Sequence, residues 1–171
     1  MSQTTDGAVV AATVRWLERA VIGLNLCPFA KAVHVKGQIR YVVSAATTPE
    51  VLADDLQREL EFLAEASTEL VDTTLLIHPH VLSDFLDFND FLDVADGIVE
   101  ELELDGMLQV ASFHPQFQFE GTAPDDISNY TNRAMIRRCS SGWRRALLRR
   151  LGFHTAHEFI SFSIKAIFHR G

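Results

Sequence analysis

Three amphipathic helical patterns alternate with three short strand patterns along this chain, and this order constrains the fold more than any other feature. The predicted helices, in which apolar residues recur three to four positions apart, span about residues 8–24, 49–66 and 84–104. The predicted strands, rich in alternating or β-branched apolar residues, span about residues 38–44, 72–78 and 107–113. Such an order favours an α/β fold with a small, mostly parallel three-stranded sheet.

The chain has 171 residues, which fits one domain, and the pattern of elements ends near residue 134. Its hydrophobic fraction of 47% and net charge of −8 exclude a disordered chain, and no apolar run approaches the ~20 residues of a membrane span. No secretory signal is visible at the N-terminus, so we expect a cytoplasmic protein. Cys27 and Cys139 suggest neither a disulfide framework nor a zinc site.

Charge is distributed unevenly between two parts of the chain. Residues 1–134 carry 22 acidic and 7 basic residues, whereas residues 135–171 carry 1 acidic and 8 basic residues. An acidic body argues against nucleic acid as a partner, because phosphate binding requires clustered Lys and Arg. We therefore expect neither nucleic acid nor membrane as the main partner.

Three stretches are not explained as core or surface: residues 25–30, 113–121 and 125–133. They contain Leu-Cys-Pro-Phe-Ala, His-Pro-Gln-Phe-Gln-Phe and Asp-Asp-Ile-Ser-Asn-Tyr-Thr-Asn-Arg, respectively. At these motifs the sequence resembles the bacterial domain of unknown function 1415 family, over roughly residues 8–134. The resemblance implies kinship and important positions but supplies no activity, so the chemistry must be inferred from the residues.

His114 follows the third predicted strand directly. In parallel sheets the carboxyl ends of the strands meet at one edge, and ligands usually bind there. His114 is therefore a candidate general acid or base, with Asp125 or Asp126 as the carboxylate that orients it. The alternative is a hydrogen-bonded structural histidine. Glu120, together with Asp125, would form the polar end of a pocket with aromatic walls.

The last stretch presents polar side chains at helical spacing. Asp126, Asn129 and Arg133 share one face of a helix predicted to begin near residue 124, with Asn132 on its flank. Arg133 suits bidentate binding of a carboxylate or phosphate, and the amides suit directional hydrogen bonds, which predicts binding of an anionic or polar small molecule. The alternative is a capped helix in which Arg133 pairs with Asp126 or Asn129.

Cys27 lies in a turn after the first predicted helix. It is a candidate nucleophile if a histidine or a helix N-terminus lowers its pKa, and the alternative is a buried, inert thiol. A metal site would use His78, His80, His114 and one aspartate, but the intervening proline perturbs the spacing, so we predict no metal. The sequence assigns no cofactor and carries no nucleotide fingerprint.

Residues 135–171 form an atypical basic tail at which the family resemblance stops. The loss of resemblance and the change in charge occur at the same position, which motivates the hypothesis that the tail is read in a shifted frame. The alternative is a genuine basic amphipathic helix for an anionic partner. Resequencing of the gene tests the hypothesis, because an intact frame that gives this same tail contradicts it.

Taken together, these residues favour a small-molecule hydrolase or transferase with a His/Asp site at the strand carboxyl edge. The rival interpretation is a non-catalytic ligand-binding or protein-interaction domain, in which His114 supports a loop. The two are separated by the surroundings of His114, since a ring enclosed by backbone carbonyls loses its role as a base. The sequence gives no indication of oligomeric state.

Overall fold

The computed structural model describes residues 2–133 and 161–166. All three predicted helices and all three predicted strands are confirmed, and the fold class is α/β. The elements in chain order are α1 (Ser2–Trp16), the π-helix η1 (Leu17–Ile22), α2 (Ala30–Val35), β1 (Ile39–Val43), α3 (Pro49–Glu65), β2 (Thr73–Ile77), α4 (Phe85–Glu101), β3 (Leu108–Phe113), the 3-10 helix η2 (Ile127–Thr131) and β4 (Ser161–Ala166).

Side-chain caps fix where α3 and α4 begin, and a glycine follows the end of η1. Thr48 caps α3 by accepting a hydrogen bond from the backbone N–H of Val51, and proline follows at the first helical position. Asp84 caps α4 by accepting from the N–H groups of Leu86, at 2.8 Å, and Asp87. At the end of η1, a Cβ on Gly23 would lie 2.4 Å from the carbonyl oxygen of Arg19, so only glycine fits there.

The sheet has four strands in the order β1-β2-β4-β3. β1 and β2 pair in parallel, while β4 pairs antiparallel with both β2 and β3. The three strands expected from the sequence therefore run in the same direction, although β2 and β3 are not neighbours. The fourth strand, β4, was not predicted, because it lies in the tail that the charge pattern sets apart. The hypothesis of a shifted reading frame for that tail stays a prediction.

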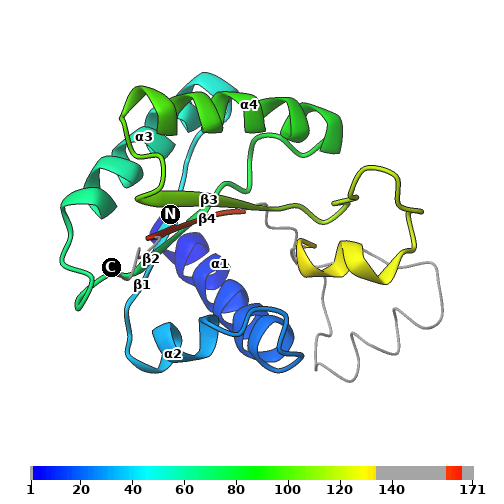
Figure 1. The fold of residues 1–171 in the computed structure, drawn as a ribbon, viewed down its shortest axis with the longest axis horizontal. Coiled ribbons are helices and arrows are strands. Elements are labelled where there is room, and N and C mark those ends of the chain that lie inside the picture. Colours follow the sequence, from blue (N-terminus) through cyan, green and yellow to red (C-terminus); the bar gives the residue numbers. More distant parts are fainter. Residues whose placement is uncertain (1, 134–160, 167–171) are drawn as a thin grey trace.

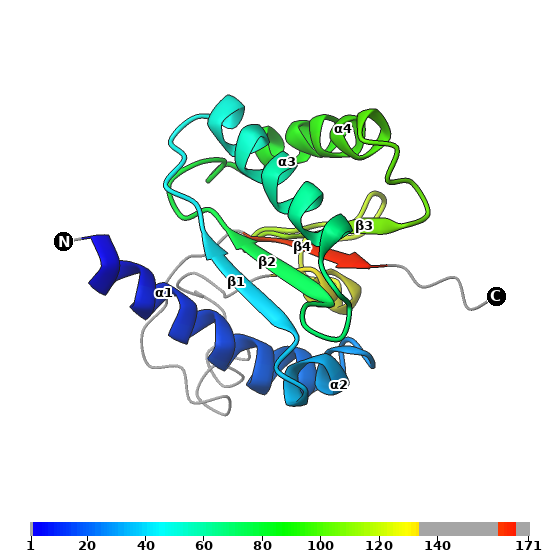
Figure 2. The same ribbon diagram turned by 90° about the vertical axis from the view of Figure 1, so that its left-hand side faces the viewer.

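Helices cover both faces of the sheet (Figures 1 and 2). α3 and α4 pack on one face over a core that includes Leu56, Leu76 and Phe88, all completely buried. α1 packs on the opposite face over a second cluster that includes Trp16 and Ile77. Burial on both faces is what a sheet of mainly same-direction strands requires. No helix within residues 2–133 is both long and apolar enough to cross a membrane.

The helix expected from about residue 124 is wrong, because the structure forms only the short 3-10 helix η2 there. Side-chain bonds to the local backbone compete with a regular helix at this position. Asp126 accepts a hydrogen bond from the N–H of Ser128 at 2.9 Å, and the hydroxyl of Thr131 donates to the carbonyl oxygen of Ser128 at 2.9 Å. Arg133 consequently lies outside the helical turn.

Candidate functional site

Three polar side chains follow directly after the three same-direction strands, at one edge of the sheet. Ser44 follows β1, His78 follows β2 and His114 follows β3. Ser44 bonds to a residue of α3, and both imidazole rings contact Phe88 of α4, so all three point toward the α3 and α4 face. The residues directly before them pack on the α1 face, as strand alternation requires: Val43, Ile77 and Phe113.

His78 is completely buried beneath α4. Its Nδ1 lies 3.2 Å from the carbonyl oxygen of Val81, and its ring stacks on Phe88 with the centroids 6.2 Å apart. Burial lowers the pKa of His78 to about 4, the bond to Val81 opposes this shift, and the nearby His114 contributes to it. His78 is therefore neutral at neutral pH.

His114 is 1% exposed and also packs on Phe88, with the ring centroids 5.0 Å apart. Its Nδ1 accepts a hydrogen bond from the backbone N–H of Gln116 at 3.0 Å. Burial lowers its pKa, an effect opposed by the backbone of Ser83 and Leu82 and by the carboxylate of Asp84. Although this backbone is close enough to act on the pKa, Nε2 makes no well-formed hydrogen bond with any described residue.

The loop between β2 and α4 encloses both histidines. It contains Leu82, which is buried and has φ of 58°, in the left-handed region that disfavours residues with a Cβ. Strained backbone of this kind persists only where the surroundings enforce it, and it is concentrated at functional sites. The loop thus has a strained backbone at Leu82 and lies directly against the rings of His78 and His114.

The two predicted carboxylate partners of His114 do not hydrogen-bond to it in the described structure. Asp125 is exposed, and Asp126 caps η2 by accepting from the N–H and the hydroxyl of Ser128, at 2.9 and 2.7 Å. These bonds lower the pKa of Asp126. Because the carboxylate that influences the pKa of His114 is Asp84, an orienting role for Asp125 or Asp126 stays a prediction.

Asn129 and Arg133 hold the loop that follows His114. Asn129 is completely buried, accepts from the N–H of Phe119 at 2.8 Å and donates to the carbonyl oxygen of Ala123 at 2.9 Å. Arg133 donates from Nε to the carbonyl oxygen of Phe117 at 2.8 Å and from Nη2 to that of residue 124 at 2.7 Å. These bonds fix the course of residues 114–124.

Asn132 extends the same support to the strand. The side-chain N–H of Asn132 donates to the backbone carbonyl oxygen of Ser112 at 3.1 Å. The backbone carbonyl oxygen of Asn132 accepts from the backbone N–H of His114, also at 3.1 Å. Glu120 is exposed at the tip of the loop. The expected substrate-binding roles stay predictions for all four residues: Asn129, Asn132, Arg133 and Glu120. The first three also make hydrogen bonds to the backbone of the loop or the strand.

Cys27 is not brought to His114. It is partly exposed and packs against the cluster on the α1 face, whereas the ring of His114 packs against α4 on the other face. A nucleophilic role for Cys27 would therefore need a partner other than His114. From the sequence, His78 was considered only as a metal ligand. A usable signal was present, because His78 and His114 each come directly after a strand and directly before a proline.

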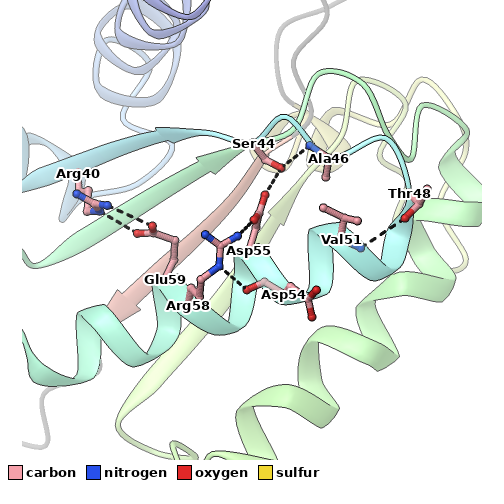
Figure 3. Close-up of polar contacts among 9 residues, drawn as sticks. All are labelled: Arg40, Ser44, Ala46, Thr48, Val51, Asp54, Asp55, Arg58 and Glu59. Atoms are coloured by element: carbon pink, nitrogen blue, oxygen red, sulfur yellow. Dashed lines mark hydrogen bonds and ion pairs between the residues drawn. The ribbon is translucent and has the colours of Figure 1, made fainter.

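Ser44 belongs to a separate polar cluster that joins β1 to α3 (Figure 3). Its hydroxyl donates to Asp55 at 2.5 Å and accepts from the N–H of Ala46 at 3.0 Å, while Arg58 pairs with the same Asp55 carboxylate. Within the described residues, no three His, Cys, Asp or Glu side chains converge as a metal site would require.

The fold and site define a class: an α/β protein with helices on both faces of its sheet and two buried, neutral histidines at the strand carboxyl edge. Comparison with known families then identifies the chain. Residues 8–137 match the family described as "Protein of unknown function (DUF1415)", so the chain belongs to this family. No curated protein and no solved structure matches it.

Proposed function

We propose that this protein is a small-molecule hydrolase or transferase that acts on a carbonyl group at the edge where β2 and β3 end, with His114 as a catalytic residue. The observation that carries the proposal is the hydrogen bond from the N–H of Gln116 to Nδ1 of His114. An N–H group can only donate, so the neutral ring must carry its own hydrogen on Nε2. We therefore assign His114 as a hydrogen-bond donor and not as the general base, a role that its burial against the backbone of Leu82 and Ser83 disfavours.

The Nε2–H of His114 is buried, and a hydrogen bond from a buried donor would act strongly on a substrate carbonyl group. A buried polar group without a well-formed hydrogen bond costs about 1–3 kcal/mol, and a fold rarely keeps one without a use for it. Burial also keeps His114 neutral by lowering its pKa. A neutral imidazole that donates from Nε2 polarises a carbonyl oxygen and stabilises the negative charge that develops on it.

Access to His114 requires movement of the loop that covers it. Residues 81–84 lie in the connection between β2 and α4, and the strained Leu82 would relax if these residues moved away from the ring. A substrate carbonyl would then replace the backbone of Leu82 and Ser83 opposite Nε2. The predicted partner is accordingly a small polar molecule, with Asp125, Asp126 and Glu120 on the exposed side of the loop after β3.

A second function is favoured by a specific observation. Asn129, Asn132 and Arg133 donate to backbone carbonyl oxygens, which indicates that they support a loop. A non-catalytic ligand-binding or protein-interaction domain would use these residues in this way, with His114 as a further support. The two functions differ in whether Nε2 of His114 acts on a ligand.

A thermal-shift screen with a library of metabolites tests the proposal on the full chain and on His114→Asn. The asparagine side chain keeps an acceptor near the position of Nδ1 but lacks Nε2. We expect a compound that raises the Tm of the unchanged protein, is consumed by it, and does neither with His114→Asn, because only the native site binds it. The matched control is His80→Asn, which removes an exposed histidine from the same loop.

Two outcomes would contradict the proposal. Compounds that raise the Tm of both proteins equally, without being consumed, would establish the non-catalytic binding domain. A library in which no compound raises the Tm of the unchanged protein would remove the small-molecule site altogether.

A further inference from the structure

His78 makes a hydrogen bond of the opposite kind from that of His114. Its Nδ1 lies 3.2 Å from the carbonyl oxygen of Val81. A carbonyl oxygen can only accept, so Nδ1 must carry the hydrogen and Nε2 must carry the lone pair. His114, whose Nδ1 accepts the N–H of Gln116, carries its hydrogen on Nε2. The two rings are therefore neutral imidazoles in opposite tautomers.

The two rings also belong to one site. Both follow same-direction strands, and both contact Phe88, which His78 stacks against and His114 meets at a tilt of 34°. They are close enough that His114 acts electrostatically on His78. A single buried region thus holds one imidazole whose Nε2 carries the lone pair and one whose Nε2 carries the hydrogen.

We propose that His78 is the general base that works opposite His114, so that the substrate is a small ester or amide whose acyl group is transferred to water. This inference rests on the proposed function and assigns it a second catalytic residue, a substrate class and an order of events. A base and an oxyanion donor on opposite tautomers are the two groups that attack of water on a carbonyl requires.

The chemical step balances with these two residues. Nε2 of His78 takes a proton from water while the water oxygen forms a bond to the carbonyl carbon. The C=O π electrons move to the carbonyl oxygen, and the resulting oxyanion accepts the hydrogen bond from Nε2 of His114. The His78 imidazolium then returns its proton to the departing alcohol or amine as the bond to the acyl carbon breaks and C=O re-forms.

Nuclear magnetic resonance of the full chain with 15N-labelled histidine tests the tautomers without any substrate. At pH 7, long-range 1H–15N correlations should show one buried ring protonated on Nδ1 and another protonated on Nε2. The correlations that disappear in His78→Asn belong to His78, and those that disappear in His114→Asn belong to His114. Two rings in the same tautomer, or a positively charged ring at either position, would overturn the inference.

Hydrolysis of p-nitrophenyl esters of short carboxylic acids tests the substrate class and the base. His78→Asn keeps an amide N–H for Val81 but lacks Nε2, so kcat should fall at least a hundredfold with little change in KM. In the unchanged protein, kcat/KM should fall at low pH because His78 becomes protonated. This fall should be absent in His78→Asn. His80→Asn should retain both parameters, and circular dichroism checks that each variant folds.

The outcomes separate this inference from the proposed function. Ester hydrolysis that survives in His78→Asn but not in His114→Asn would overturn the role of His78 alone. An unchanged protein that hydrolyses none of the esters would overturn the substrate class, while metabolite binding that depends on His114 would still support the proposed function.

Discussion

The end of β1 and the ends of β2 and β3 solve the same structural problem in different ways. At β1, Ser44 donates to Asp55 and accepts from Ala46, and Arg58 neutralises the carboxylate. At β2 and β3, His78 and His114 are buried as neutral rings, and Nδ1 of each makes a hydrogen bond to the local backbone. A polar residue at a strand end is thus insufficient to indicate a site, and the type of residue and the tautomer that its local bonds select are more informative.

The largest expected effect comes from the residue that both imidazoles contact. Phe88 is completely buried, and Phe88→Ala should lower the free energy of unfolding by about 3–5 kcal/mol, because it leaves a cavity in the core beside both rings. Urea denaturation measures the change. Leu86→Ala, at a position 70% exposed on the same helix, is the control and should change stability little. Equal losses in both variants would show that Phe88 does not organise this region.

A smaller effect is expected from pH. The pKa of His78 is about 4 when folded and near 6.5 in an unfolded chain, so the folded state binds fewer protons. Its contribution to stability is complete above pH 6.5 and is lost as pH falls toward 4, a loss of roughly 3 kcal/mol. Denaturation of the unchanged protein and of His78→Asn at pH 7 and pH 4 measures it. Identical pH dependence in both proteins would mean that His78 does not titrate as a buried group.

The smallest effect is expected at β1. Ser44→Ala removes the acceptor for the N–H of Ala46 and should cost about 1–2 kcal/mol, with the sheet and its two histidines otherwise unchanged. Arg58→Ala, which breaks an exposed ion pair, should cost no more than about 0.5 kcal/mol. If Ser44→Ala also abolished ester hydrolysis while remaining folded, the two regions would not differ in function as we propose.

Periodicity predicted most of the scaffold, and it failed where partners are distant in sequence. α3 and α4 were predictable because their apolar stripes follow one helix face for 17 residues each. β4 was not, because its place is decided by pairing with β2 and β3 far earlier in the chain. The position of His114 at the sheet edge followed from the strand pattern, but its tautomer depends on the turn that brings Gln116 back to it.

The hydrogen bonds of Arg133 also depend on residues distant in sequence, and the sequence pattern did not predict them. Its side chain suits an anion as well as a pair of carbonyl oxygens, and only the course of the loop decides between them. The acceptors lie on residues 117 and 124, 16 and 9 positions earlier, and no local pattern indicates that they converge. His78 was underestimated for a related reason, since its ring is defined by a contact with Phe88 across the core.

The insertion of β4 between β2 and β3 has a consequence for biosynthesis. A ribosome makes residues 73–77 and 108–113 well before residues 161–166, so the nascent chain carries two strand edges with unsatisfied backbone groups. Open edges of this kind are templates for pairing with other chains, and late, non-local pairing is slow. Newly made molecules would therefore depend on chaperones, or on low expression temperature, until the final strand enters the gap.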